Sequence, residues 1–179
     1  FSQGQPLALF AHRRIREKPP GGGVSVFRES IPLAQPITDY ALKIVQSAQW
    51  LGVAMVEFKV DRESGVPYLI EVNGRFWGSL QLAIDAGVDF PFLTYQLATI
   101  GRLDTMEAKY RVGVKSRWFL GDLDQLLLRL RKSDEQLGLS PGGPTKGQAL
   151  REFLRCTDRQ THPEVFRLRD PQPGLYELR

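Results

Sequence analysis

Two segments of alternating apolar and polar residues, joined by a short polar turn, constrain the fold of this chain most strongly. The segments VAMVEFKV, at residues 53–60, and YLIEVN, at residues 68–73, each alternate as strands with one buried face do. The segment DRESG between them is polar and contains a glycine, which is typical of a hairpin connection. The sequence therefore predicts an antiparallel β-hairpin over residues 53–73.

The two faces of this hairpin fix its register. Val56 and Val72 belong to the apolar sides of their strands, whereas Glu57, Glu71 and Asn73 belong to the polar sides. A slip of one residue would turn carboxylates into the core, where an unpaired charge is strongly unfavourable. We therefore expect the three polar residues to share one face, with directly opposite residues about 5 Å apart.

Two carboxylates and an amide oxygen at this spacing are suitable ligands for Mg²⁺ or Mn²⁺. Mg²⁺ is commonly held by one or two carboxylates together with substrate phosphates. Arg75 follows Asn73 by two residues, and its fork of donors fits a phosphate or acyl-phosphate oxygen. The alternative is an ordinary solvated sheet face, on which Glu57 pairs with Lys59 or Arg75. Like charges facing each other across a hairpin disfavour that alternative unless a cation is bound.

The rest of the chain mixes short strands with amphipathic helices. We expect strands at residues 7–10, 24–27 and 111–119, and helices at 37–51, 79–86, 90–100, 122–130 and 148–155. A loop is expected at residues 19–23 and a linker at 140–147. No apolar run approaches the ~20 residues of a membrane helix, so no membrane partner is expected.

Composition excludes several kinds of site. The chain of 179 residues has one cysteine, which excludes an internal disulfide, and two histidines, too few for a histidine metal cluster. The 24 basic and 20 acidic residues give a mild net charge of +4. The densest basic run, at residues 13–18, is short and contains Glu17, so a nucleic-acid partner is not expected.

The motifs at the hairpin resemble those of the ATP-grasp superfamily. The sequences VEFKVD, at residues 56–61, and YLIEVNGRFWGSLQLAIDAG, at 68–87, are similar to the metal-binding hairpin and following helix of carbamoyl phosphate synthase large chains, biotin carboxylase and related carboxylate–amine ligases. The segment HRRIREKPPGGGVSVFRES, at residues 12–30, resembles the strand and loop that precede the central helix of these enzymes. The resemblance covers residues 7–101 and is weaker beyond residue 109.

The resemblance implies an α+β fold: the C-terminal lobe of an ATP-grasp fold, N-terminally truncated, with a mainly antiparallel sheet and flanking helices. Residues 1–108 would be the C-terminal part of the ATP-grasp domain, and residues 109–179 a helical and irregular extension. It also implies ATP as cofactor with two Mg²⁺ or Mn²⁺ ions. The implied site consists of metal ligands Glu57, Glu71 and Asn73, catalytic Arg75, and cofactor-binding His12, Arg14 and Arg16.

The implied enzyme is a cytoplasmic ligase that phosphorylates a small-molecule carboxylate, whose acyl phosphate is then attacked by an amine or another nucleophile. Its remaining partner would be the missing N-terminal part of its own chain, and a homodimer is one expected assembly. These 179 residues alone are therefore expected to be inactive. Two alternatives stay open: a non-catalytic relative that binds nucleotide or metal, and a basic nucleic-acid-binding domain.

Overall fold

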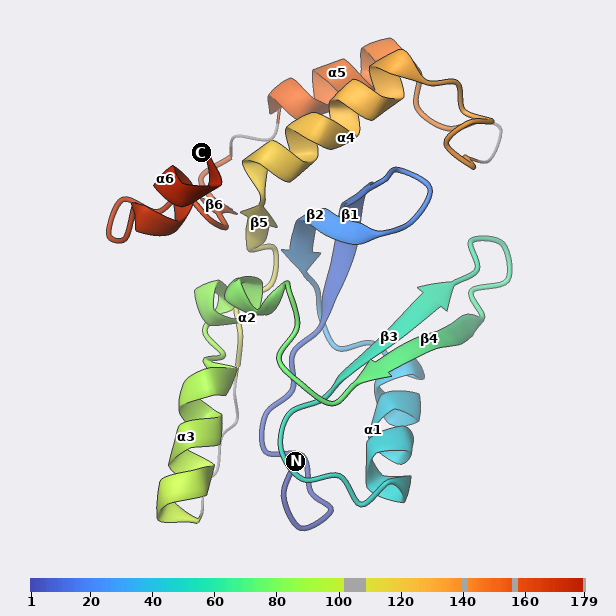
Figure 1. Ribbon diagram of the computed structural model, residues 1–179. Coiled ribbons are helices and arrows are strands. Elements are labelled where there is room, and N and C mark those ends of the chain that lie inside the picture. Colours follow the sequence, from blue (N-terminus) through green and yellow to red (C-terminus); the bar gives the residue numbers. More distant parts are fainter. Residues whose placement is uncertain (102–108, 140–141, 156–157, 179) are drawn as a thin grey trace. The chain divides into compact units, whose positions relative to one another are not determined.

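The computed structural model describes residues 1–101, 109–139, 142–155 and 158–178, and these form an α+β fold (Figure 1). The described chain divides into two compact units, Phe1–Ala11 with Pro32–Tyr110 and His12–Ile31 with Arg111–Arg179. The elements are β1 (His12–Lys18), β2 (Val24–Ser30), α1 (Ile37–Ser47), β3 (Met55–Val60), β4 (Pro67–Asn73), α2 (Leu80–Ala86), α3 (Phe90–Ile100), β5 (Lys115–Arg117), α4 (Phe119–Arg131), α5 (Lys146–Arg155), β6 (Thr161–Pro163) and α6 (Gln172–Glu177).

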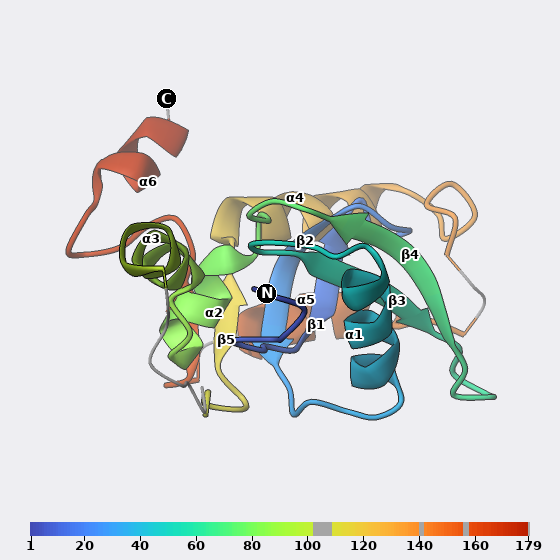
Figure 2. The same cartoon turned by 90° about the horizontal axis from the view of Figure 1, so that it is seen from below.

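The first unit contains the predicted hairpin, formed by β3 and β4, together with α1, α2 and α3. Helix α1 lies beside the hairpin in both views (Figures 1 and 2). The Asp89 carboxylate accepts a hydrogen bond of 2.9 Å from the backbone N–H of Phe92 and so caps α3. Gly87 and Gly101 end α2 and α3 in the left-handed conformation.

The second unit contains a four-stranded sheet in the order β1-β2-β5-β6. Its first three strands are antiparallel, whereas β5 and β6 are parallel. Helix α4 packs against β1 and β2, and α5 runs alongside α4 (Figure 1). Val26, Phe27 and Leu126 are buried in this unit. The structure is thus a mixed-sheet α+β fold, which agrees with the expected lobe.

Three element predictions differ from the structure. The strand predicted at residues 7–10 is wrong, because the first long strand is the charged segment β1. The strand predicted at 111–119 is reduced to β5, since α4 already begins at Phe119. Helix α1 ends at Ser47, before the predicted residue 51.

The division of the family domain at residue 108 stays a prediction. The structure adds that the β1–β2 hairpin belongs to the same unit as the segment after residue 111. Among the described residues, no helix has both the length and the apolar character needed to cross a membrane.

Candidate functional site

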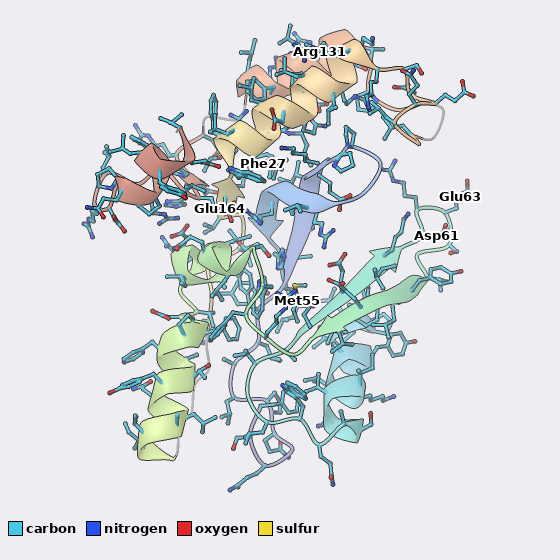
Figure 3. All side chains as sticks on the ribbon, in the orientation of Figure 1. Phe27, Met55, Asp61, Glu63, Arg131 and Glu164 are labelled. Carbon is cyan, nitrogen blue, oxygen red and sulfur yellow. The ribbon has the colours of Figure 1, made fainter. Side chains whose placement is uncertain are left out.

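The register of the β3–β4 ladder places three oxygen-bearing side chains on one face. Glu57 is directly opposite Glu71, and Met55 is directly opposite Asn73. Because opposite residues in an antiparallel pair point to the same side, Glu57, Glu71 and Asn73 share a face, as the alternation predicted. The cluster lies at the end of the hairpin that Met55 marks, whereas Asp61 and Glu63 lie in the turn at the other end (Figure 3).

A β-bulge follows the carboxylate pair immediately. Phe58 is paired with Leu69, so Ile70 is an extra residue in β4. The predicted alternation of β4 therefore holds from Glu71 to Asn73 and shifts by one residue on the turn side. Bulges increase the local twist and re-aim neighbouring side chains, and they are frequent beside functional sites.

The side chains of this cluster are accessible and partly organised. The Asn73 amide nitrogen Nδ2 donates a hydrogen bond of 2.6 Å to Glu71 Oε1, which leaves the amide oxygen out of this bond. Glu71 is exposed, while Glu57 and Asn73 are half-buried. Two carboxylates and an amide form a hard oxygen donor set that fits Mg²⁺ or Mn²⁺. No group of three or more His, Cys, Asp or Glu suited to a metal occurs among the described residues.

Arg75 is held in the loop that leaves β4. Its Nη1 atom donates a hydrogen bond of 3.0 Å to the carbonyl oxygen of Phe76. A Cβ atom at the neighbouring Gly74 would lie 2.5 Å from the ring of Trp50, so only glycine allows this close approach. The Trp50 indole is itself fixed by a hydrogen bond of 2.9 Å to the carbonyl oxygen of Val53. The loop that carries the guanidinium is therefore positioned by backbone packing.

The predicted cofactor-binding residues lie on β1, in the second unit. Arg16 is engaged there by a buried carboxylate: its Nε and Nη2 atoms donate to the two oxygens of Asp122, at 2.5 and 2.7 Å. Arg117 Nε donates to the same carboxylate at 2.6 Å. The predicted contact of Arg16 with ATP stays a prediction, and in this structure its fork is occupied by Asp122.

His12 and Arg14 neighbour a third basic residue, Arg28, which the sequence reading missed. Burial, followed by the charges of Arg28 and Arg14, lowers the pKa of His12 to about 4, so its imidazole is neutral at pH 7. Arg14 Nη1 donates to Glu17 at 3.0 Å and to the carbonyl of Gly23 at 3.1 Å. The local sequence pattern did not mark Arg28, because this residue lies just beyond the strand predicted at residues 24–27.

Comparison with known proteins gives one match. A family model described as "ATP-grasp in the biosynthetic pathway with Ter operon" matches residues 8–118, which is more than half of the chain. The matched region contains the hairpin, the loop with Arg75, and strands β1 and β2. Searches of curated proteins and of solved structures found no match.

Proposed function

The chain belongs to the ATP-grasp family, and on this premise we propose that it carries the metal and phosphate site of a ligase that activates a carboxylate as an acyl phosphate. Family membership makes it an ATP-dependent, ligase-like domain. The observation that carries the finer proposal is the Glu57–Glu71 pair with Asn73 on the same face. Such a cluster suits divalent ions that accompany a nucleotide triphosphate.

In the proposed reaction, an oxygen of the substrate carboxylate attacks the γ-phosphorus of ATP, and the bond to the ADP oxygen breaks. A nucleophile then attacks the acyl carbon, phosphate leaves, and the proton of the nucleophile passes to solvent. Bound divalent ions would neutralise the negative charge of the phosphate groups. Glu57, Glu71 and Asn73 would hold those ions, and the Arg75 fork would orient and stabilise the transferred phosphoryl group.

The pairing of the basic run supports a ligase over a nucleic-acid-binding domain. Each of its cations has a carboxylate partner: Arg13 pairs with Glu29, Arg14 with Glu17, Arg16 with Asp122, and Lys18 with Asp124. A nucleic-acid surface instead presents basic side chains to phosphates. The presence of both acids, the amide and the arginine in one unit supports turnover over a non-catalytic relative.

The proposal is tested by trapping the acyl phosphate with hydroxylamine. The protein is incubated with Mg²⁺, ATP and a panel of carboxylic acids, and hydroxamate and ADP are measured. We expect equal amounts of both products from the wild-type protein, a loss of most turnover in Glu71→Gln, and normal turnover in Glu63→Gln, whose carboxylate lies in the turn. Near-normal hydroxamate from Glu71→Gln, or ADP without hydroxamate from the wild-type protein, would contradict the proposal.

A further inference from the structure

A row of polar residues crosses the four-stranded sheet of the second unit on one face. Arg14 of β1 is directly opposite Arg28 of β2, Arg28 is opposite Ser116 of β5, and Ser116 is opposite His162 of β6. Side chains at paired positions on neighbouring strands point to the same side of a sheet, at a spacing of about 5 Å. Two guanidinium groups, a hydroxyl and an imidazole therefore come from one continuous line of the sheet.

The middle of this row is buried and has unused hydrogen-bonding capacity. Arg28 is 2% exposed and Ser116 is 0% exposed. Within the described part of the chain, neither Arg28 Nε nor Ser116 Oγ has a hydrogen-bond partner. Buried donors are rarely left unsatisfied in folded proteins, and such an exception indicates a bound water, ion or ligand. Because the two atoms come from adjacent positions, one bound group with several acceptor oxygens suits both.

The charges of the row favour an anion as that group. Arg14 and Arg28 are like charges at directly opposite positions, an arrangement that is destabilising unless negative charge lies nearby. Glu17 pairs with Arg14 and Glu164 pairs with Arg28, which supplies such charge. The Nε atom of the Arg28 cation nevertheless has no hydrogen-bond partner among the described residues, and an anion would satisfy this atom. The field of the two arginines also contributes to the lowered pKa of His12, whose position pairs with Ser30 two residues along β2.

The exposure of the side chains falls along the row, from Arg14 to Ser116. The Arg14 side chain is 31% exposed, whereas Arg28 and Ser116 are almost completely buried. Hydrogen bonds between a charged group and such donors are stronger than those made at a solvated surface.

We propose that Arg14, Arg28 and Ser116, here called the arginine row, bind an oxyanion, either a carboxylate or a phosphate group. The assignment of that anion rests on the proposed function, because a ligase of this kind handles both a carboxylate substrate and phosphate. The arginine row adds Arg28 to the cofactor-binding residues His12, Arg14 and Arg16 that the resemblance implied, and the fork of Arg16 is occupied by Asp122 in this structure.

The test is calorimetric titration of the full chain with inorganic phosphate and, separately, with acetate. Whichever anion binds the wild-type protein, Arg14→Gln and Ser116→Ala are expected to lower the affinity for it by about tenfold or more. A loss of this size is typical of a charge-assisted hydrogen bond. Arg13→Gln is the matched control, because Arg13 is the neighbouring residue of β1 on the opposite face, pairs with Glu29 and is 65% exposed. It should bind the anion as the wild-type protein does.

Three results would overturn the inference. The first is that the wild-type chain binds neither anion, and the second is that Arg13→Gln loses as much affinity as Arg14→Gln. The third is that Ser116→Ala binds the anion normally, which would leave a buried water as the explanation for the unsatisfied atoms. Arg28→Gln is avoided because this substitution would leave the Glu164 carboxylate without its cationic partner.

Repeating both titrations with Mg²⁺ and ATP present distinguishes the source of the anion. Retained acetate binding assigns the arginine row to the substrate carboxylate, and competition by ATP assigns it to a nucleotide phosphate. Because binding requires no turnover, this inference and the proposed ligase reaction fail separately. Anion binding without hydroxamate formation contradicts only the reaction, and hydroxamate formation without the anion site contradicts only the arginine row.

Discussion

Glu57 and Glu71 face each other directly across the ladder of β3 and β4. Like charges at such positions destabilise a hairpin by roughly 0.2–1 kcal/mol. The hydrogen bond from Asn73 to Glu71 satisfies one carboxylate oxygen but does not neutralise its charge. A bound divalent cation would satisfy the carboxylate oxygens and neutralise their charge, so the proposed ion binding would be coupled to hairpin stability at this pair.

The first prediction concerns the sign of that coupling. Without metal, Glu71→Gln should leave the stability of the protein unchanged or slightly raised, because a like-charge pair is removed while the acceptor for Asn73 is kept. With Mn²⁺, the wild-type melting temperature should rise and that of Glu71→Gln should not. Thermal unfolding with and without Mn²⁺, together with electron paramagnetic resonance of free Mn²⁺, measures both effects.

Glu63→Gln is the control for the metal experiment, because this substitution removes a negative charge from the same hairpin, but at its turn (Figure 3). Its response to Mn²⁺ should equal that of the wild-type protein. If Glu71→Gln retains the wild-type response, Glu71 is not a metal ligand.

The second prediction concerns Asp122, which is 0% exposed and accepts hydrogen bonds from Arg16 and Arg117. Asp122→Asn leaves two largely buried guanidinium groups without their shared counter-charge. Removing one partner of a buried ion pair costs about 3–5 kcal/mol. Urea unfolding should therefore show a loss of this size.

A neighbouring aspartate provides the matched control. Asp124 pairs with Lys18, and both side chains are substantially exposed, at 52% and 33%. Exposed pairs contribute about 0–1 kcal/mol, so Asp124→Asn should be nearly neutral in the same urea experiment. Equal losses in the two variants would show that burial does not decide the strength of these pairs.

The hairpin and the helices α2 and α3 could be predicted because their signals are local. Alternation over six to eight residues defined β3 and β4, and Asp89 and Gly101 stand at the ends of α3 where a cap is needed. The shared face of Glu57, Glu71 and Asn73 followed from the same alternation.

The residue pattern alone did not predict strand β1, which only the family resemblance indicated, because the stabilising partners of this strand are remote in sequence. The segment HRRIREK has no apolar alternation, and Arg16 finds its carboxylate, Asp122, 106 residues further along the chain. The bulge at Ile70 was equally hidden, since nothing in an alternating pattern marks an extra residue. The arginine row depends on the order β1-β2-β5-β6, which joins strands more than 80 residues apart.

The third prediction is a pH dependence caused by His12. Its folded-state pKa of about 4 lies below the ordinary histidine pKa of 6.5, so as pH falls from 6.5 to 4 the unfolded chain takes up a proton that the folded chain does not. The contribution to stability is complete above pH 6.5 and is lost towards pH 4, by roughly 2–3 kcal/mol. Urea unfolding from pH 7 to pH 4 should show this slope, and His12→Gln should flatten it. An identical slope in His12→Gln would assign the pH dependence to other groups.

The last prediction contrasts two glycines that should respond to alanine with opposite signs. Gly87 ends α2 with a φ of 113°, a conformation that a Cβ atom disfavours, so Gly87→Ala should lower stability by about 1 kcal/mol. Gly147 lies inside α5 with no atom within 4 Å of an added Cβ, so Gly147→Ala should raise stability by up to about 1 kcal/mol. Urea unfolding of both variants measures the two changes. A gain from Gly87→Ala would mean that the left-handed end of α2 is not required by the fold.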